Sequence, residues 1–253
     1  SSTFSNCTSL TTAPVIPNSV TSMTLAFSGC TSLTTAPAIP SSVTSMSSTF
    51  SCCTSLTTAP AIPSSVTDMS YTFSGCTSLT TAPLIPNSVT DMSYTFSGCT
   101  SLTTAPVIPS SVTSMKGTFF RCTALTTAPI IPSSVTSMNG TFDGCTALHT
   151  IQNFAVDVDN CGMTNAFQNC PSLANIYVTT LSESSWHLLH TDTDATGTDY
   201  TIYNTDGTVA GNGTVAGTSQ VLSLYGKSDE LVISDNITPT LAVETATSQV
   251  QWH

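Results

Sequence analysis

The chain has 253 residues, of which 40% are hydrophobic and only 7% are charged, and its net charge is −11. Its only basic residues are Lys116, Arg121 and Lys227. Because a phosphate backbone is bound through clustered Lys and Arg, we expect no nucleic-acid partner. No run of about 18 apolar residues is present, so we also expect no membrane insertion.

Residues 1–180 consist of a repeated unit with a period of 23 residues. Within it, phenylalanine, cysteine and methionine each keep a fixed place. The residues in these three columns are Phe4, Phe27, Phe50, Phe73, Phe96, Phe119 and Phe142; Cys7, Cys30, Cys53, Cys76, Cys99, Cys122 and Cys145; and Met23, Met46, Met69, Met92, Met115 and Met138. A period of about 20 to 29 residues with a leucine at a fixed place predicts a leucine-rich-repeat solenoid.

The unit itself indicates how one coil is built. We expect a short strand over Cys-Thr-Ser-Leu-Thr-Thr-Ala, ended by two prolines such as Pro83 and Pro86, which cannot donate to a strand ladder. A second extended segment, Ser-Val-Thr-x-Met, follows it. Gly75 and its equivalents Gly29, Gly98 and Gly144 suit a turn with positive φ. The unit has no room for a long helix, so we predict a β-rich solenoid of about seven to eight coils.

Each unit also contains the run Met-x-x-x-Phe-x-Gly-Cys-x-x-Leu. It is formed by Met69, Phe73, Gly75, Cys76 and Leu79, and again by Met92, Phe96, Gly98, Cys99 and Leu102. This run resembles the BspA-like leucine-rich repeats of bacterial surface proteins, over roughly residues 1–178. The resemblance implies adhesion, host-protein binding or scaffolding, and it brings no catalytic residue.

The first unit is as apolar as the inner ones, although a solenoid needs terminal units with a polar outer face. The chain starts at Ser1, as a processed or trimmed chain would, and no capping segment precedes Phe4. We therefore expect either that an N-terminal portion is missing or that a second subunit covers this end, giving a head-to-tail filament. The residues that would make this contact are Leu10, Ile16, Val20 and Met23.

Departures from the repeat cluster on the third to sixth units. Asp68 and Asp91 share one column, with Tyr71 and Tyr94 three positions later, where most other units have small residues. The further departures are Lys116, Phe120 and Arg121. Exposed Tyr and Arg are favoured binding anchors, so these seven residues form a candidate contact patch. The alternative is solvent-exposed variation with a local Asp–Lys pair.

Two other columns bear on the surface. The residue before each isoleucine is Val15, Ala38, Ala61, Leu84, Val107 or Ile130. If the isoleucine points inward, this column forms an exposed apolar stripe. If the bend at the prolines turns the column toward the interior, the column is part of the core. Thr11 and Thr12 begin two threonine rows that suggest ice binding. Against this, consecutive residues of a strand point to opposite faces.

After Tyr177 the period ends, and we predict a separate small all-β domain or cap over residues 181–253. Strands are expected at Thr198–Tyr203, Gln220–Tyr225 and Glu230–Ser234, with a tight turn at Asp206-Gly207 and a short helical link over Leu181–His190.

Metal and thiol chemistry is weakly indicated. The cysteine column places one thiol per coil along a line, which predicts buried thiols and not a metal site or disulfides. Cys52 and Cys161 lie off this column and are the better candidates for disulfide or reactive thiols. His187 and His190 have no evident third metal ligand. A weak calcium candidate is formed by Asp192, Asp194 and Asp199, and it lacks the bidentate Glu of an EF-hand loop.

The sequence therefore predicts a non-enzymatic, extracellular structural and adhesion protein without a cofactor. It is secreted or on a cell surface, and it assembles head-to-tail through the first coil. Its partner is then a second copy of the chain. The alternative is a monomeric module, on a bacterial or virion surface, that binds a host protein or glycan.

Overall fold

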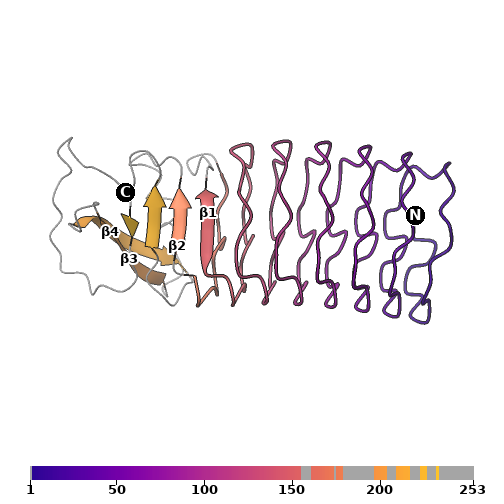
Figure 1. Ribbon diagram of the computed structural model, residues 1–253, viewed down its shortest axis with the longest axis horizontal. Helices are drawn as coiled ribbons and strands as arrows, with labels where there is room; N and C mark the ends of the chain where they lie inside the picture. Colours follow the sequence, from indigo (N-terminus) through magenta and orange to yellow (C-terminus); the bar gives the residue numbers. More distant parts are fainter. Residues whose placement is uncertain are drawn as a thin grey trace.

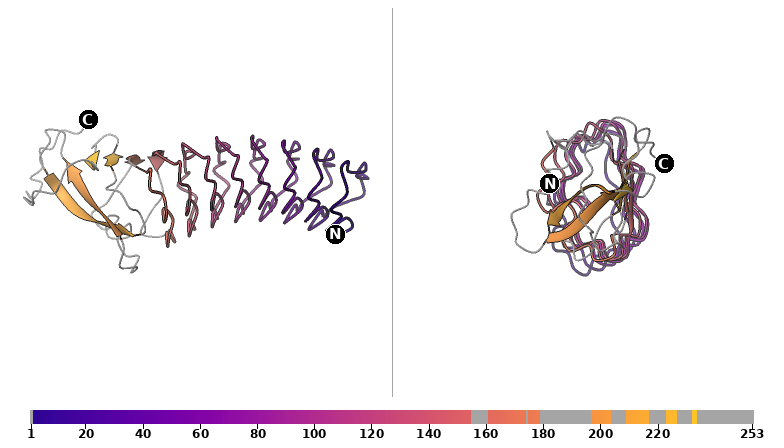
Figure 2. Two further views of the ribbon diagram at one scale, coloured as in Figure 1. Left: turned by 90° about the horizontal axis from the view of Figure 1, so that it is seen from below. Right: turned by 90° about the vertical axis from the view of Figure 1, so that its left-hand side faces the viewer.

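The computed structural model shows a solenoid whose coils lie one behind another along the long axis (Figure 1). Seen end-on, the coils superpose in a flattened ring (Figure 2). The structure describes residues 2–154 and 161–173, and the backbone of the strands that follow. We number the coils by their phenylalanines, so that coil 1 starts at Phe4 and coil 4 at Phe73.

Coils 1 to 6 are joined by single-residue parallel bridges and not by strands. One set of bridges begins with Thr12 and Thr35, and the other runs through Ser45, Asp68 and Asp91. The two expected extended segments are therefore reduced to one paired residue each in these coils. Turns limit the pairing on either side, because Val66 and Leu79 each donate their N–H to a carbonyl three residues back.

The turn around Phe73 satisfies every backbone N–H between Met69 and Cys76. Alternate N–H groups bond within the coil and to the next coil: Thr72 donates to the carbonyl of Met69, whereas Phe73 donates to that of Thr95. The same scheme recurs at 23-residue intervals. It explains why these coils stack in register without regular strands.

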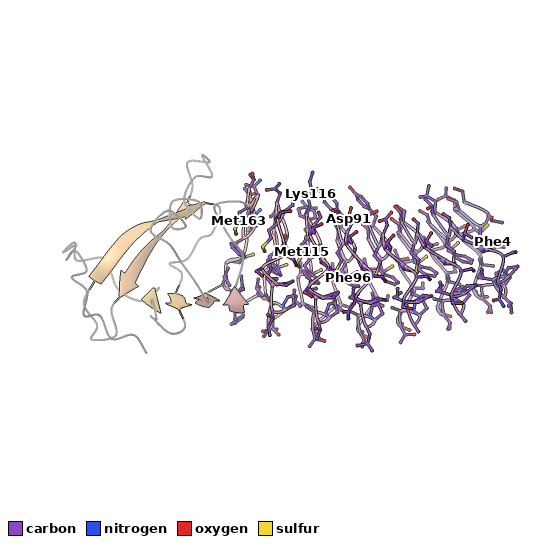
Figure 3. All side chains as sticks on the ribbon, turned by 90° about the horizontal axis from the view of Figure 1, so that it is seen from above. Phe4, Asp91, Phe96, Met115, Lys116 and Met163 are labelled. Atoms are coloured by element: carbon purple, nitrogen blue, oxygen red, sulfur yellow. The ribbon has the colours of Figure 1, made fainter. Side chains whose placement is uncertain are left out.

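The core consists of columns that run through the stack. The phenylalanine rings lie nearly parallel from coil to coil, with centroids 5.7 Å apart for Phe73 and Phe96. A buried threonine column lies beside them, in which the Thr95 hydroxyl is shared between the carbonyls of Met69 and Met92 at 2.9 and 2.8 Å. Figure 3 shows Phe96 within the stack. The core therefore contains ordered polar contacts as well as apolar side chains.

Regular strands begin only near residue 150 and form one six-stranded sheet of order β1-β2-β5-β6-β3-β4. Its strands are β1 (Thr150–Phe154), β2 (Asn175–Val178), β3 (Gly197–Tyr203), β4 (Val209–Ala216), β5 (Ser223–Gly226) and β6 (Val232–Ile233). β1 pairs with β2, and β2 with β5, in parallel. β3 and β4 pair antiparallel.

Three of these strands, β3, β5 and β6, overlap the strands expected from the sequence. β4 was not expected, because its glycines and small residues conceal any alternation. The proposed boundary at residue 180, the helical link over 181–190 and the turn at Asp206-Gly207 lie outside the described residues. A separate C-terminal domain therefore stays a prediction.

Candidate binding surface

All seven residues of the candidate contact patch lie in, or one position before, the turn that runs from the methionine to the cysteine of each coil. Asp68 and Asp91 are bridged as direct neighbours. We call this group the aromatic edge; it comprises Asp68, Tyr71, Asp91, Tyr94, Lys116, Phe120 and Arg121. Figure 3 shows Asp91 and Lys116 toward the same side of the stack. The stacking of coils thus brings together residues that are up to 53 positions apart in the sequence.

The two aspartates are held by the turns that follow them. One carboxylate oxygen of Asp68 accepts the backbone N–H of Ser70 at 2.8 Å, and Asp91 accepts that of Ser93 at 2.7 Å. The other oxygen of Asp68 accepts the Ser45 hydroxyl at 3.4 Å. These carboxylates therefore complete the turns, as Asp side chains do in Asx turns. This role was not expected from the sequence.

Tyr71 and Tyr94 form a stacked pair, with ring centroids 4.7 Å apart and an angle of 15° between the rings. Both adopt left-handed backbone conformations, with φ of 56° and 54°. The Tyr94 ring leans over Gly117, where a side chain would overlap it. Desolvation raises the pKa of Tyr71, and the neighbouring Tyr94 and Asp91 add to the effect. The pair leaves part of Tyr71 exposed to solvent.

The basic end of the aromatic edge is formed by three residues from coils 5 and 6. The Arg121 guanidinium lies over the Phe120 ring, 5.0 Å from its centroid, which is a cation–π contact. Arg121 occupies a glycine column and has φ of 57°. Lys116 is exposed. Aromatic rings, carboxylates and cations thus follow one another along a single edge.

Each turn has two left-handed positions, of which one was expected from the sequence. The expected glycine column is confirmed, since Gly75 and Gly98 have φ of 74° and 71°. The second column contains Tyr71, Tyr94 and Gly117. Glycine in coils 5 and 6, Gly117 and Gly140, was the signal that could have revealed it.

The column before each isoleucine is exposed, which settles the two alternatives for it. Val15, Leu84, Val107 and Ile130 have exposed fractions of 92%, 87%, 80% and 59%. Ala38 and Ala61, in the same column, are also exposed. We call these six residues the apolar stripe. It lies on the part of each coil between the two prolines.

The threonine rows differ from expectation. Thr11 and Thr12 are both exposed, and so are Thr80 and Thr81 in coil 4. Consecutive residues do not alternate here, because each coil has a single bridge residue in place of an extended strand. The argument from strand alternation against two exposed threonine rows is therefore wrong for this chain.

The column cysteines from coil 2 onward are buried, as expected, and they also donate hydrogen bonds. The Cys99 thiol donates to the carbonyl of Phe73 at 3.2 Å in the preceding coil, and the other column thiols repeat this contact. Burial raises the pKa of Cys99 to about 12. Of the two off-column cysteines, Cys52 is exposed, whereas Cys161 is buried.

The side chains of the candidate metal ligands lie outside the described part of the chain. His187, His190, Asp192 and Asp194 lie outside the described residues, and only the backbone of Asp199 is described. Within the described part of the chain, no group of three or more His, Cys, Asp or Glu is placed to hold a metal ion. The same residues contain no helix that is long and apolar enough to span a bilayer.

The first coil leaves its core residues incompletely covered. Leu10 and Val20 are only half-buried, whereas their equivalents Leu33 and Val43 in the next coil are 0% exposed. Ile16 is half-buried as well, but so is Ile39 in the next coil, so its exposure is not an effect of the chain end. Met23 is already covered, with 1% exposed. Of the four residues expected to make an end-to-end contact, Leu10 and Val20 therefore offer apolar surface that is covered at the same places in the next coil.

Two solved structures are similar to the chain. One is a leucine-rich repeat protein from Bacteroides ovatus ATCC 8483, with 26% identity, a TM-score of 0.49 and coverage of 69% of this chain and 51% of that one. The other is a leucine rich cell surface protein from Faecalibacterium prausnitzii A2-165, with 23% identity, a TM-score of 0.33 and coverage of 71% and 62%. The chain thus spans less than two thirds of the length of either.

No curated protein matches the chain in sequence. The model of the BspA type leucine-rich repeat region, in six copies, matches residues 1–126 and 69–186. These two matches cover the whole solenoid, and therefore both the aromatic edge and the apolar stripe. The chain belongs to the BspA-type leucine-rich repeat family.

Proposed function

We propose that the chain is an extracellular, non-enzymatic structural and adhesion protein that contacts its target through the aromatic edge. The observation that carries this proposal is the clustering of the departures from the repeat in one turn of successive coils. Most other coils have small residues at these positions, so a coil does not need these side chains in order to fold, and all seven are at least partly exposed. Stacked tyrosines and an arginine on phenylalanine are suited to the face of a sugar ring or to a protein hot spot.

A non-enzymatic role fits the surroundings of the carboxylates. Asp68 and Asp91 both accept backbone N–H groups within their own turns. They also lie in one bridged column, at the spacing of neighbouring chains, about 4.8 Å, which is below the range for a glycosidase pair. These observations favour contact over catalysis at this edge.

The proposal is tested by restoring the repeat at the aromatic edge. Tyr71→Ser with Tyr94→Ser introduces the residue that Ser48 provides in coil 2. We expect this double variant to lose at least about tenfold in binding to a glycan array or to intact host cells. Thr77→Ala with Thr100→Ala, on another exposed column, is the matched control. Unchanged binding by the tyrosine variant would refute the assignment of the edge.

Head-to-tail assembly into a filament is a second candidate, supported by the half-buried residues of coil 1. Another coil placed there would bury Leu10 and Val20, and such a contact does not close on itself. We expect negative-stain micrographs of the purified chain to show fibres, and Leu10→Glu to abolish them. Thr11→Glu, which is exposed on the same coil, is the control. Single particles at every concentration would exclude the filament.

A further inference from the structure

The apolar stripe is a continuous exposed surface for which the proposed function provides no partner. Its members follow one another at one residue per coil through six coils, and each lies between two prolines, as in Pro83-Leu84-Ile85-Pro86. Proline fixes φ and has no N–H, so the stripe has a stiff backbone with few donors that need water. Covering such a surface costs little conformational entropy.

The surface around the stripe contains no charge. In coils 1 to 6, the segment from the column cysteine to the threonine after the valine, such as 76–90, has no Asp, Glu, Lys or Arg. The charged side chains of these coils are Asp68, Asp91, Lys116 and Arg121, all on the aromatic edge. For a chain with a net charge of −11, this is a face on which a second copy meets no like charge.

The order of small and large side chains along the stripe is complementary to the same order read in reverse. From coil 1 to coil 6 it is Val, Ala, Ala, Leu, Val, Ile. If a second stripe runs antiparallel, Ala61 lies opposite Leu84, Ala38 opposite Val107, and Val15 opposite Ile130. Every alanine then faces a large side chain. A parallel arrangement places alanine against alanine and leucine against leucine, which leaves gaps at coils 2 and 3.

We propose that the apolar stripe is the interface of an antiparallel, two-fold symmetric dimer of this chain. A two-fold axis makes each pair occur twice, so the small-against-large match of coils 3 and 4 is formed on both sides of the axis. The nearly straight stack in Figure 2 allows all six coils to take part. Six residues from each copy form a small interface, so the dimer dissociates on dilution, with a Kd in roughly the micromolar range.

The first test is sedimentation of the full chain over a range of concentrations around that value. We expect a concentration-dependent dimer that Ala61→Lys or Leu84→Glu converts to monomer. Both positions are exposed, so the fold is retained, which circular dichroism checks. Thr67→Lys and Thr90→Glu place the same charges on exposed sites of the same coils and should leave the dimer intact. A wild-type chain that stays monomeric throughout overturns the proposal.

Mixing the two stripe variants tests the orientation. In the antiparallel dimer, the lysine introduced at position 61 faces the glutamate introduced at position 84, while the other pair keeps its native Ala61 and Leu84. The equimolar mixture should therefore regain the dimer that each variant alone has lost. In a parallel dimer each new charge faces a native residue, and the two charges are offset by one coil, about 4.8 Å, instead of lying directly opposite each other. A mixture that remains monomeric overturns the antiparallel arrangement.

This result is separable from both candidate functions. Leu10→Glu removes the proposed end-to-end contact but leaves the apolar stripe unchanged, so the dimer should persist in that variant. Tyr71→Ser with Tyr94→Ser should likewise dimerise as the wild type does. Loss of the dimer in either of these variants would place the contact elsewhere and overturn the assignment of the stripe.

Discussion

Two left-handed backbone positions in every turn determine which residues the turn accepts. Gly117 and Gly140 occupy the same column in neighbouring coils, with φ of 58° and 62°. Any side chain is strained there by about 1–2 kcal/mol. The two sites differ in their surroundings, because the Tyr94 ring covers Gly117 whereas nothing lies within 4 Å of a Cβ at Gly140.

We therefore predict that Gly117→Ala destabilises the chain by about 2–3 kcal/mol and Gly140→Ala by about 1 kcal/mol. The additional loss at Gly117 comes from displacing Tyr94 from its stack with Tyr71. Urea unfolding of the two variants measures the difference. Combining Gly117→Ala with Tyr94→Ser should remove it, and equal losses in both single variants would show that Tyr94 does not constrain Gly117.

The buried thiols make stability depend on pH at the alkaline side. Desolvation raises the pKa of Cys53 and of Cys99 to about 12, from 9.0 for an ordinary thiol. Between these values the unfolded chain releases thiol protons that the folded chain retains. The free energy of unfolding is therefore unaffected by these thiols below pH 9, and it falls as the pH rises toward 12.

We predict a lower free energy of unfolding at pH 11 than at pH 8, accompanied by proton release on unfolding. Cys99→Val keeps the side chain apolar and of similar size, so it should reduce the slope of stability against pH by about one proton. Thr100→Val, at an exposed side chain that does not titrate, should leave that slope unchanged. A stability that is constant between pH 8 and 11 would contradict the burial of these thiols.

At the scale of one coil, the buried threonine column joins each turn to the preceding one. The Thr95 hydroxyl lies 2.9 Å from the Met69 carbonyl of coil 3 and 2.8 Å from the Met92 carbonyl of coil 4. Valine has the same shape but cannot donate. We predict that Thr95→Val costs about 1–2 kcal/mol, because buried carbonyl groups lose a donor.

Thr100→Val provides the control, since its hydroxyl is exposed and lies 3.4 Å from the Thr77 carbonyl. We expect a change within about 0.5 kcal/mol for this variant, measured in the same denaturant titration. If the two threonine variants lose equal stability, the buried hydroxyl does not contribute more than an exposed one.

Sequence periodicity was sufficient to predict the columns but not the path of the backbone between them. The buried Phe, Cys and Met columns and one left-handed column follow from spacing and residue type alone. The reduction of strands to single bridges does not, because the sequence Leu79-Thr80-Thr81 has the β-propensity of a strand. The stacking of Tyr71 on Tyr94 was also beyond prediction, since it is a contact between coils.

The candidate surface was predictable to a similar extent. Departures from the repeat located the aromatic edge, since comparing coils needs no structure. Proline-flanked isoleucines left two alternatives for the apolar stripe, because the inward or outward direction depends on the bend. The turn-capping role of Asp68 required the position of the Ser70 N–H, which sequence spacing alone did not indicate.

At the scale of the whole molecule, stability is shared between neighbouring coils, so the effect of a core substitution depends on its place in the stack. Phe96 is fully buried and stacks on both Phe73 and Phe119, at 5.7 and 5.8 Å. Phe4 is half-buried and stacks on Phe27 at 5.3 Å. The same truncation therefore removes two interfaces at coil 5 and one at coil 1.

We predict that Phe96→Ala destabilises the chain by about 3–5 kcal/mol and Phe4→Ala by roughly half as much. Because Phe96 lies in the middle of the array, its loss also weakens the coupling between the coils on either side, and the single unfolding transition should broaden or divide in two. Calorimetry and urea unfolding followed by circular dichroism measure both effects. Equal losses with one sharp transition in each variant would mean that the solenoid unfolds as a single globular unit, and that nearest-neighbour stacking does not govern its stability.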